Sequence, residues 1–271
     1  MRKLIQVSLL VLFSFAVVYS GLCDDSKNAD LKKTTINFAT NANCRVHVDA
    51  MIPLLEAKGY KVKLTNFDDP ISIDVATEEG SVDANYYQHL PYMNNFNRSR
   101  GGHLVMVKPY LLGSVMGMFS KKHKSIDALP DGGTVTLAMD GSNKDRAIRM
   151  MRDYGLVTLR ETPASGMYTL IDIIGNPKKL KFVELDLYQL PRSMDEVDAS
   201  IFSAIYLISA GQDLSSAICF SKDDVDHPIG VVVRAENENA QWLKDLMEAM
   251  ASDQCRKVAK EAYKGGYSIL F

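Results

Sequence analysis

The sequence lacks the short motifs that mark common catalytic and nucleotide-binding sites. It has no G-x-x-x-x-G-K-[ST] loop, and no G-x-G-x-x-G segment follows a strand-like run. H-E-x-x-H and G-x-S-x-G are absent as well. Cys44 precedes His47 by three residues, but no third group that could orient the imidazole is identifiable. We therefore expect a protein that is not an enzyme and that uses no cofactor.

Cysteine is scarce, and neither sign of charge dominates. Beyond Cys23, the chain has only Cys44, Cys219 and Cys255, which form no C-x-x-C pair, so no metal site is expected. One disulfide would suit an oxidising compartment, but the sequence does not choose its partners. The formal net charge of −2 gives no support to nucleic acid as a partner.

The first 22 residues have the pattern of a secretory signal peptide. Two basic residues precede an apolar run over 4–18, and small residues follow. Cys23 then stands where the cysteine of a bacterial lipobox is acylated, although Leu22 is unusual before it; cleavage after Ser20 is the alternative. We expect a lipid on Cys23, a polar tether over 23–33, and anchoring to the cell membrane facing the periplasm or the exterior.

From residue 34 the chain alternates strand-like and helix-like segments, which predicts an α/β architecture with parallel sheets. The expected strands cover 35–39, 61–67, 82–86, 103–107, 113–119, 134–139, 181–185, 197–202 and 229–234. The expected helices cover 46–58, 71–79, 88–97, 143–154, 167–174, 204–210 and 239–264. The pattern T-I-N-F-A-T-N-A-N at 35–43 is echoed by T-V-T-L-A-M-D-G-S at 134–142. Such echoes suit two similar lobes that face one another.

Ligands of open α/β sheets bind beyond the carboxyl ends of the strands. That rule brings four segments around one cleft: 40–44, 86–92, 140–146 and 202–206. The aromatic-rich stretch D-A-N-Y-Y-Q-H-L-P-Y-M-N-N-F-N at 83–97 therefore either packs the interior or lines a pocket for a small molecule. Asn143 and Arg146 begin a helix at the same edge. Arg146 could hold a carboxylate bidentately, but its spacing is equally compatible with exposure on the solvent side.

Four segments carry a resemblance to a known family: D-A-N-Y-Y-Q-H-L-P-Y-M (83–93), K-K-H-K-S-I-D-A-L-P-D-G (121–132), N-P-K-K-L-K-F-V-E-L (176–185) and Q-L-P-R-S-M-D-E-V-D-A (189–199). They resemble the NlpA family of methionine-binding lipoproteins, the substrate-binding components of bacterial ABC importers. The resemblance implies a two-lobed α/β fold of the periplasmic-binding-protein type with a ligand cleft between the lobes. Lobe I would comprise residues 34–112 plus 226–271, and lobe II residues 113–225.

The resemblance also implies site residues. Tyr87, His89 and Tyr92 would line the side-chain pocket, and Arg146 would hold the ligand carboxylate. Asn143 and Ser203 are also expected to bind the ligand, and Ser203 stands where the family has a ligand-binding asparagine. Three further positions depart from the family pattern: a proline and histidine are replaced by Asn43-Cys44, a pocket tyrosine by Pro70, and a second asparagine by Gly230.

We therefore expect a receptor that binds methionine, or a closely related amino acid or small peptide, and delivers it to an ABC permease and its ATPase. The alternative is a surface or periplasmic interaction protein that kept the fold but lost or changed its ligand. Ser203 and Gly230 lack the amides of the asparagines they replace. Free methionine is therefore expected to bind weakly. The alternative is that Gly230 and Pro70 open room for a bulkier relative, such as a methionine-containing dipeptide, which would then bind better.

Overall fold

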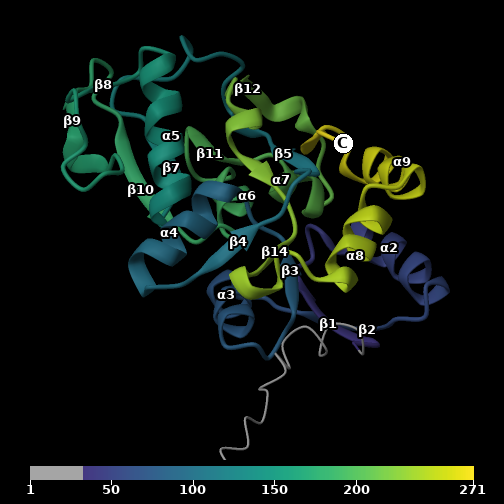
Figure 1. Ribbon diagram of the computed structural model, residues 1–271. Helices are drawn as coiled ribbons and strands as arrows, with labels where there is room; N and C mark the ends of the chain where they lie inside the picture. The colour runs from purple at the N-terminus through teal and green to yellow at the C-terminus, as the bar shows by residue number, and fades with distance from the viewer. Residues whose placement is uncertain (1–32) are drawn as a thin grey trace, which may run out of the picture.

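The computed structural model describes residues 33–271, and it contains two five-stranded sheets flanked by helices (Figure 1). The expected signal peptide and Cys23 lie outside the described residues. We call each sheet with its helices a lobe. The strands of the first sheet all come from the expected lobe I, and those of the second from lobe II. The two-lobed α/β fold is confirmed, while the residue boundaries of the lobes stay a prediction.

The first sheet has the strand order β2-β1-β3-β14-β4. Its first three strands are parallel, and β14 runs antiparallel to both of its neighbours. Their bounds are β1 (Thr35–Thr40), β2 (Lys61–Asn66), β3 (Ala84–Tyr86), β4 (Leu104–Met106) and β14 (Val232–Arg234). The associated helices are α2 (Arg45–Ala57), α3 (Pro70–Glu78), α4 (Leu90–Arg100), α8 (Gln241–Met250) and α9 (Asp253–Tyr263). A core that includes Phe38, Met51 and Trp242 fixes helices α2 and α8 to the sheet.

The second sheet has the order β10-β7-β11-β6-β12. Its strands β10, β7 and β11 are parallel, and β6 runs antiparallel to both of its neighbours, β11 and β12. The bounds are β6 (Met116–Phe119), β7 (Thr134–Ala138), β10 (Lys181–Leu185), β11 (Ala199–Ser203) and β12 (Ala217–Phe220). Its helices are α5 (Gly141–Asp153), α6 (Leu190–Ser193) and α7 (Ile205–Ser209). A separate core, including Leu137, Ile148 and Ile201, lies between α5 and the sheet. Each lobe therefore buries its own apolar interior.

The chain passes between the lobes twice, on neighbouring strands. It leaves the first lobe through β5 (Leu112–Ser114) and returns through β13 (Pro228–Ile229), which pairs antiparallel with β5. The carboxyl-terminal strand β15 (Tyr267–Ile269) pairs with the other edge of β5. Shorter elements are the pair β8 (Thr158–Leu159) and β9 (Ile173–Gly175), and the 3₁₀ turns η1 (Leu170–Asp172), η2 (Leu214–Ser216), η3 (Asp224–Asp226) and η4 (Ala235–Asn237).

Two expected helices are wrong in detail. The single helix expected over 239–264 is two helices, because Ser252 ends the first and caps the second by accepting a hydrogen bond from the Cys255 amide. The helix expected over 167–174 is the turn η1 followed by β9. There the buried Asp172 carboxylate accepts hydrogen bonds from the Thr169 amide and hydroxyl, which favours a turn over a continued helix.

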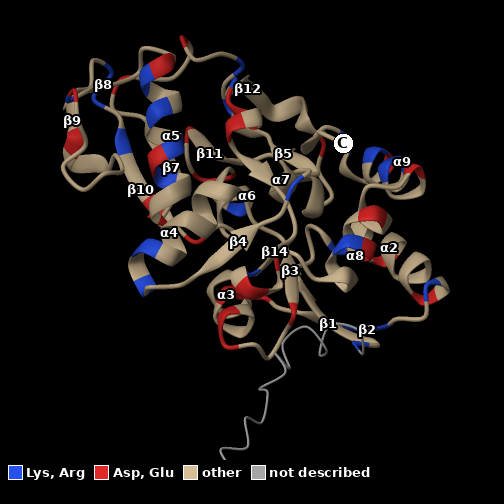
Figure 2. Ribbon diagram, in the orientation of Figure 1, with Lys and Arg blue, Asp and Glu red and all other residues tan. Residues whose placement is uncertain are grey.

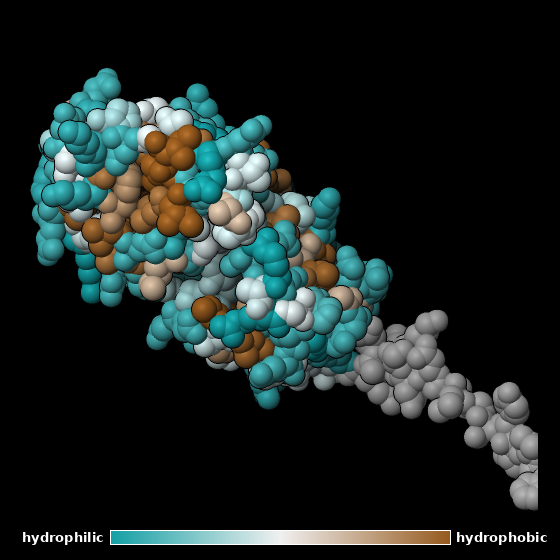
Figure 3. All heavy atoms as spheres, turned by 90° about the vertical axis from the view of Figure 1, so that its left-hand side faces the viewer, coloured by the Kyte–Doolittle hydropathy of each residue, from teal (hydrophilic) through white to brown (hydrophobic). Residues whose placement is uncertain are grey.

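The outer surface is mixed in charge and carries scattered apolar areas. Basic and acidic residues are interspersed along the helices of both lobes (Figure 2). The side of the molecule that lies to the left in Figure 1 shows apolar areas among hydrophilic ones (Figure 3). Large exposed apolar side chains of the second lobe include Ile171, Ile174 and Val183, in η1, β9 and β10. Within residues 33–271, no helix has the length and apolar character needed to cross a membrane.

Candidate functional site

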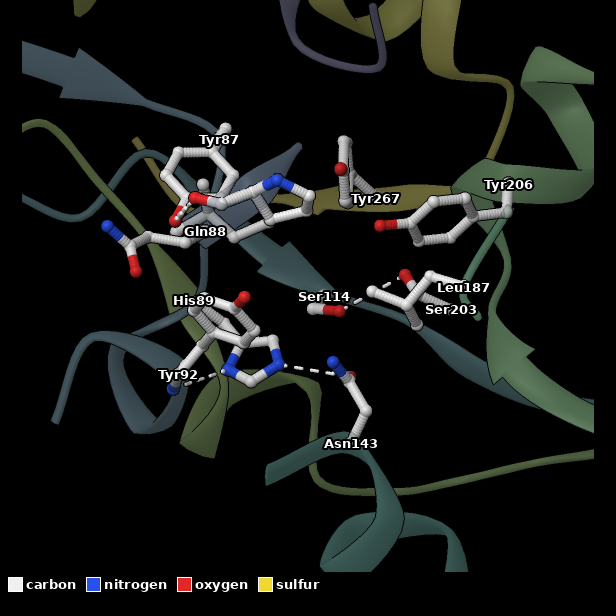
Figure 4. A pocket seen from close by; sticks show the side chains of 12 residues that line it. Tyr87, Gln88, His89, Tyr92, Ser114, Asn143, Leu187, Ser203, Tyr206 and Tyr267 are labelled. Carbon is white, nitrogen blue, oxygen red and sulfur yellow. Dashed lines mark hydrogen bonds between the residues drawn. The ribbon is translucent and has the colours of Figure 1, made fainter. Parts of the chain in front are cut away.

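A pocket of about 400 Å³, counting its open mouth, lies between the two lobes (Figure 4). Its wall combines residues that follow β3 and β10, residues at the starts of α3 and α5, the end of β11, one residue of α7, and residues of β5, β13 and β15. They are Pro70, Tyr87, Gln88, His89, Tyr92, Ser114, Asn143, Leu187, Ser203, Tyr206, Ile229 and Tyr267. The carboxyl ends of parallel strands from both sheets therefore meet at one site, as the sheet rule predicts.

Aromatic rings form one wall of this pocket. The Tyr87 and Tyr92 rings meet edge to face with their centroids 6.1 Å apart, and His89 meets Tyr92 in the same way at 6.1 Å. The Tyr87 hydroxyl donates to the Pro70 carbonyl at 2.8 Å, which fixes its ring. The stretch after β3 thus both packs the lobe and lines the pocket. Such a wall suits an apolar side chain of modest size.

His89 forms a hydrogen bond between the two lobes, and its imidazole is neutral. As the N-cap of α4 it accepts a hydrogen bond at Nδ1 from the Tyr92 amide, so Nε2 carries the proton and donates to Asn143 Oδ1 at 3.1 Å. Burial lowers the pKa of His89 to about 3, and the nearby His227 and Arg146 add to the effect. Asn143 is held in turn by the Asp140 carboxylate, which caps α5.

Two serines face each other across the polar side of the pocket. Ser114 Oγ on β5 lies 3.2 Å from Ser203 Oγ at the end of β11. Behind Ser114 lies Arg146, whose side chain is fully buried and is not among the described residues that line the pocket. Its Nη1 donates to Ser114 Oγ at 3.2 Å, and its Nη2 donates to the Ser114 carbonyl at 2.6 Å.

Arg146 also forms a bidentate ion pair inside the protein. Its Nε lies 3.1 Å from both carboxylate oxygens of Asp223, and its Nη2 lies 2.7 Å from Oδ1. Asp223 comes from the segment between β12 and η3, far from α5 in the sequence. Among the described lining residues, none carries a formal charge at neutral pH, since His89 is neutral.

A comparison with known families matches the chain over residues 35–270 to the family described as NlpA lipoprotein. The chain belongs to the NlpA lipoprotein family. A relative from Vibrio cholerae, named a probable D-methionine-binding lipoprotein MetQ, is 32% identical over 241 residues, covering 89% of each chain. The D-methionine-binding lipoprotein MetQ of Escherichia coli K12 is 32% identical over 211 residues, covering 77% of each.

Solved structures show the same fold as this NlpA lipoprotein. A nutrient-binding protein from Burkholderia cenocepacia, solved with bound methionine, superposes with a TM-score of 0.81 at 31% identity, covering 87% of this chain and 100% of that one. A periplasmic substrate-binding protein of an ABC transporter from Coxiella burnetii has a TM-score of 0.80 at 31% identity, covering 86% and 99%. The resemblance seen in the sequence is confirmed.

Five of the six ligand-binding residues expected in this NlpA lipoprotein line the pocket: Tyr87, His89, Tyr92, Asn143 and Ser203. The sixth, Arg146, does not line the pocket and lies behind Ser114. What each contributes to ligand binding stays a prediction. Gln88 and Tyr206 also line the pocket, and both lie in segments that the sheet rule placed at the cleft, 86–92 and 202–206, although neither was named as a ligand-binding residue. Sequence reasoning missed the other lining residues, namely Ser114, Leu187, Ile229 and Tyr267, because their segments gave no such signal.

Gly230 does not open the space that the sequence suggested. A Cβ built on it would lie 2.9 Å from Met106 Cγ and 3.3 Å from the Val107 carbonyl oxygen. The Met106 side chain therefore fills the volume that a larger residue at position 230 would need. Pro70, by contrast, does line the pocket. Of the two positions expected to open room, only Pro70 borders the pocket.

The other thiols and His47 show no sign of a reactive site. Among the described residues Cys44, Cys219 and Cys255 are free thiols, of which Cys219 is half-buried and the other two are buried, and burial raises the pKa of Cys44 to about 12, which leaves it un-ionised. His47 lies between the Tyr86 hydroxyl and the Met250 carbonyl, at 3.0 Å from each. In the part of the chain from residue 33 onward, no cluster of three or more His, Cys, Asp or Glu side chains could hold a metal ion.

Proposed function

We propose that this NlpA lipoprotein is the ligand-binding component of an ABC importer, and that its pocket takes methionine or a closely related amino acid or small peptide. The observation that carries the proposal is the combination of an aromatic wall with neutral polar groups at the meeting point of the two lobes. The relatives named for D-methionine binding, and the related structure with methionine, support the same ligand class. A permease and an ATPase of the same importer are the expected partners.

Calorimetry on refolded, ligand-stripped protein tests this function. We expect L- or D-methionine, methionine sulfoxide or a short methionine peptide to bind, with the tightest binder identifying the ligand. Tyr92→Ala should weaken that binding at least tenfold, about 1.4 kcal/mol, because it removes half of the edge-to-face pair. Tyr60→Ala, which removes a tyrosine outside the pocket, is the matched control and should bind as the wild type does.

Failure of every one of these compounds to bind would support the rival function, an interaction protein that kept the fold without the ligand. We also infer that the chain is not an enzyme. Cys44 is buried and un-ionised, and His47 hydrogen-bonds to the Tyr86 hydroxyl and the Met250 carbonyl rather than to Cys44, which supports this inference.

We further propose that Cys23 carries a lipid that anchors the protein to the membrane. Membership of a lipoprotein family supports this site, which lies outside the described residues. Mass spectrometry of the mature protein should find an acylated Cys23 as its first residue. An unmodified amino terminus at Gly21 would mean ordinary cleavage after Ser20 and no anchor.

A further inference from the structure

The guanidinium of Arg146 has little hydrogen-bonding capacity left for a ligand. It has five N–H donors. The Nε donor is shared between both Asp223 oxygens. Nη2 donates hydrogen bonds to Asp223 Oδ1, Ser221 Oγ and the Ser114 carbonyl. Nη1 donates to Ser114 Oγ. One N–H on Nη1 is then unassigned, and the side chain is 1% exposed.

The Asp223 carboxylate is only half-buried, with 31% of its side chain exposed, but its ion pair with Arg146 fixes it in place. Burial acts to raise its pKa, but the hydrogen bonds and charge of Arg146 outweigh burial and hold the pKa below its ordinary value, so Asp223 is ionised at neutral pH. On its other side, His227 Nδ1 lies 3.3 Å from Oδ2. Burial and the charge of Arg146 lower the pKa of His227, which leaves the imidazole neutral. The positive charge of Arg146 is therefore balanced within the protein.

Ser114 is the group through which Arg146 reaches the pocket. Its hydroxyl accepts from Nη1, so its own proton points elsewhere, toward Ser203 Oγ or a ligand oxygen. Figure 4 shows the two serine side chains facing each other, with Asn143 and Tyr206 on either side. The head-group side of the pocket thus presents hydroxyl and amide groups, with the charge pair behind them.

We propose that Asp223 is a specificity-determining residue, because its ion pair with Arg146 keeps the guanidinium from binding the ligand. The pocket then favours an uncharged carbonyl head group, as in an amide, ester or peptide bond, over a free carboxylate. This inference rests on the proposed function and deepens it. A carboxylate would have to displace Asp223 from a bidentate pair or lie against neutral groups in a buried site, and both are unfavourable. An amide carbonyl needs only a hydroxyl donor, which Ser114 supplies.

Two ligands that differ only in the head group provide the test: N-acetyl-L-methionine, a carboxylate, and N-acetyl-L-methioninamide, its uncharged amide. The measured quantity is the ratio of their dissociation constants, obtained by calorimetry on the full mature chain. We expect the wild type to bind the amide at least tenfold more tightly. Asp223→Asn keeps the side-chain shape but frees the charge of Arg146, so it should shift the ratio at least tenfold toward the carboxylate.

Asp226→Asn is the matched control, because Asp226 is an exposed carboxylate of the same segment without a hydrogen bond to Arg146 among the described contacts. It should leave the ratio unchanged. Because Asp223→Asn could destabilise the fold by leaving Arg146 incompletely paired, a second variant combines Arg146→Gln with Asp223→Asn. This variant removes both charges and should keep the preference of the wild type for the amide.

A wild type that prefers the carboxylate, or an Asp223→Asn ratio within twofold of the wild-type ratio, would overturn the inference while leaving the proposed function standing. Loss of the amide preference in the double variant would also overturn it. Binding of neither compound to any variant would overturn the inference, while the proposed function is decided separately by the binding of methionine, its sulfoxide and methionine peptides.

Discussion

At the scale of single residues, Asp74 is a buried carboxyl beside the pocket whose pKa is strongly raised. It is fully buried on α3, where Oδ1 accepts from Gln88 Nε2 and Asn85 Nδ2, and Oδ2 has no partner among residues 33–271. Burial raises the pKa of Asp74 to about 7, and the hydrogen bonds offset only part of that effect. Gln88, which lines the pocket, therefore donates a hydrogen bond to a carboxyl group whose pKa is near 7.

This raised pKa makes stability depend on pH. In the unfolded chain Asp74 loses its proton near pH 3.8, whereas in the folded chain it keeps it up to about pH 7. Between these values the folded state holds the extra proton, so the contribution of Asp74 to stability falls as the pH rises from about 4 to about 7. Asp74→Asn should remove this fall and stabilise the protein at pH 8, by at most a few kcal/mol.

Urea unfolding at pH 5 and pH 8 measures the effect, with Asp127→Asn, an exposed carboxylate in a loop, as the control. The stability difference between Asp74→Asn and the wild type should be larger at pH 8 than at pH 5. Equal differences at the two pH values would show that Asp74 is ionised throughout.

At the scale of elements, the first turn of α5 connects the cap of one helix to the contact between the lobes. Asp140 caps α5 by accepting from the Asn143 amide at 3.0 Å, and it also holds the Asn143 side chain, which meets His89 of the first lobe. A local sequence signal, an aspartate three residues before an asparagine, thereby positions a contact between distant parts of the chain.

Asp140→Ala should lower the free energy of unfolding by about 1 kcal/mol through loss of the cap. It should also weaken ligand binding several-fold, because Asn143 is no longer held toward His89. Thermal denaturation and calorimetry measure the two effects. Ser252→Ala removes the cap of α9, whose residues lie outside the pocket wall, so it should cost similar stability and leave affinity unchanged. Equal affinities for the two variants would contradict a role for the α5 cap in binding.

At the scale of the whole molecule, the lobes meet through polar contacts and through apolar packing of α7, whose Ile205 joins the core of the first lobe, and they are joined by the adjacent strands β5 and β13. The contacts include His89 with Asn143 at 3.1 Å and Ser209 Oγ with Asn43 Oδ1 at 2.7 Å. Two crossing strands side by side permit a hinge rotation, and a ligand that touches both lobes favours the closed state.

We expect the radius of gyration measured by small-angle scattering to fall when the ligand identified by calorimetry is added. Asp226→Asn should close in the same way, because its side chain lies outside the contacts between the lobes described here. Clear binding heat with superimposable scattering curves would instead indicate a preformed, rigid pocket.

The residues that the sequence predicted best are those encoded by local patterns. Tyr87, His89 and Tyr92 follow a short buried strand and start a helix, so their place at a carboxyl edge followed from the order of strands and helices. The same reasoning found the parallel strands of both sheets. By contrast, the break at Ser252 was missed because a helical period alone does not show which serine acts as a cap.

The sequence by itself determined the α/β class, the family and the aromatic side of the pocket, because periodicity, turn residues and short motifs are local properties. Only the tertiary structure decided the polar side. Arg146 and Asp223 are 77 residues apart, and Ser114 meets Ser203 across 89 residues, so no local pattern could pair them. Tyr267 lines the pocket only because β15 pairs with β5. Such non-local pairings depend on how the two sheets pack, and here they decide whether the arginine faces a ligand or an aspartate of the same chain.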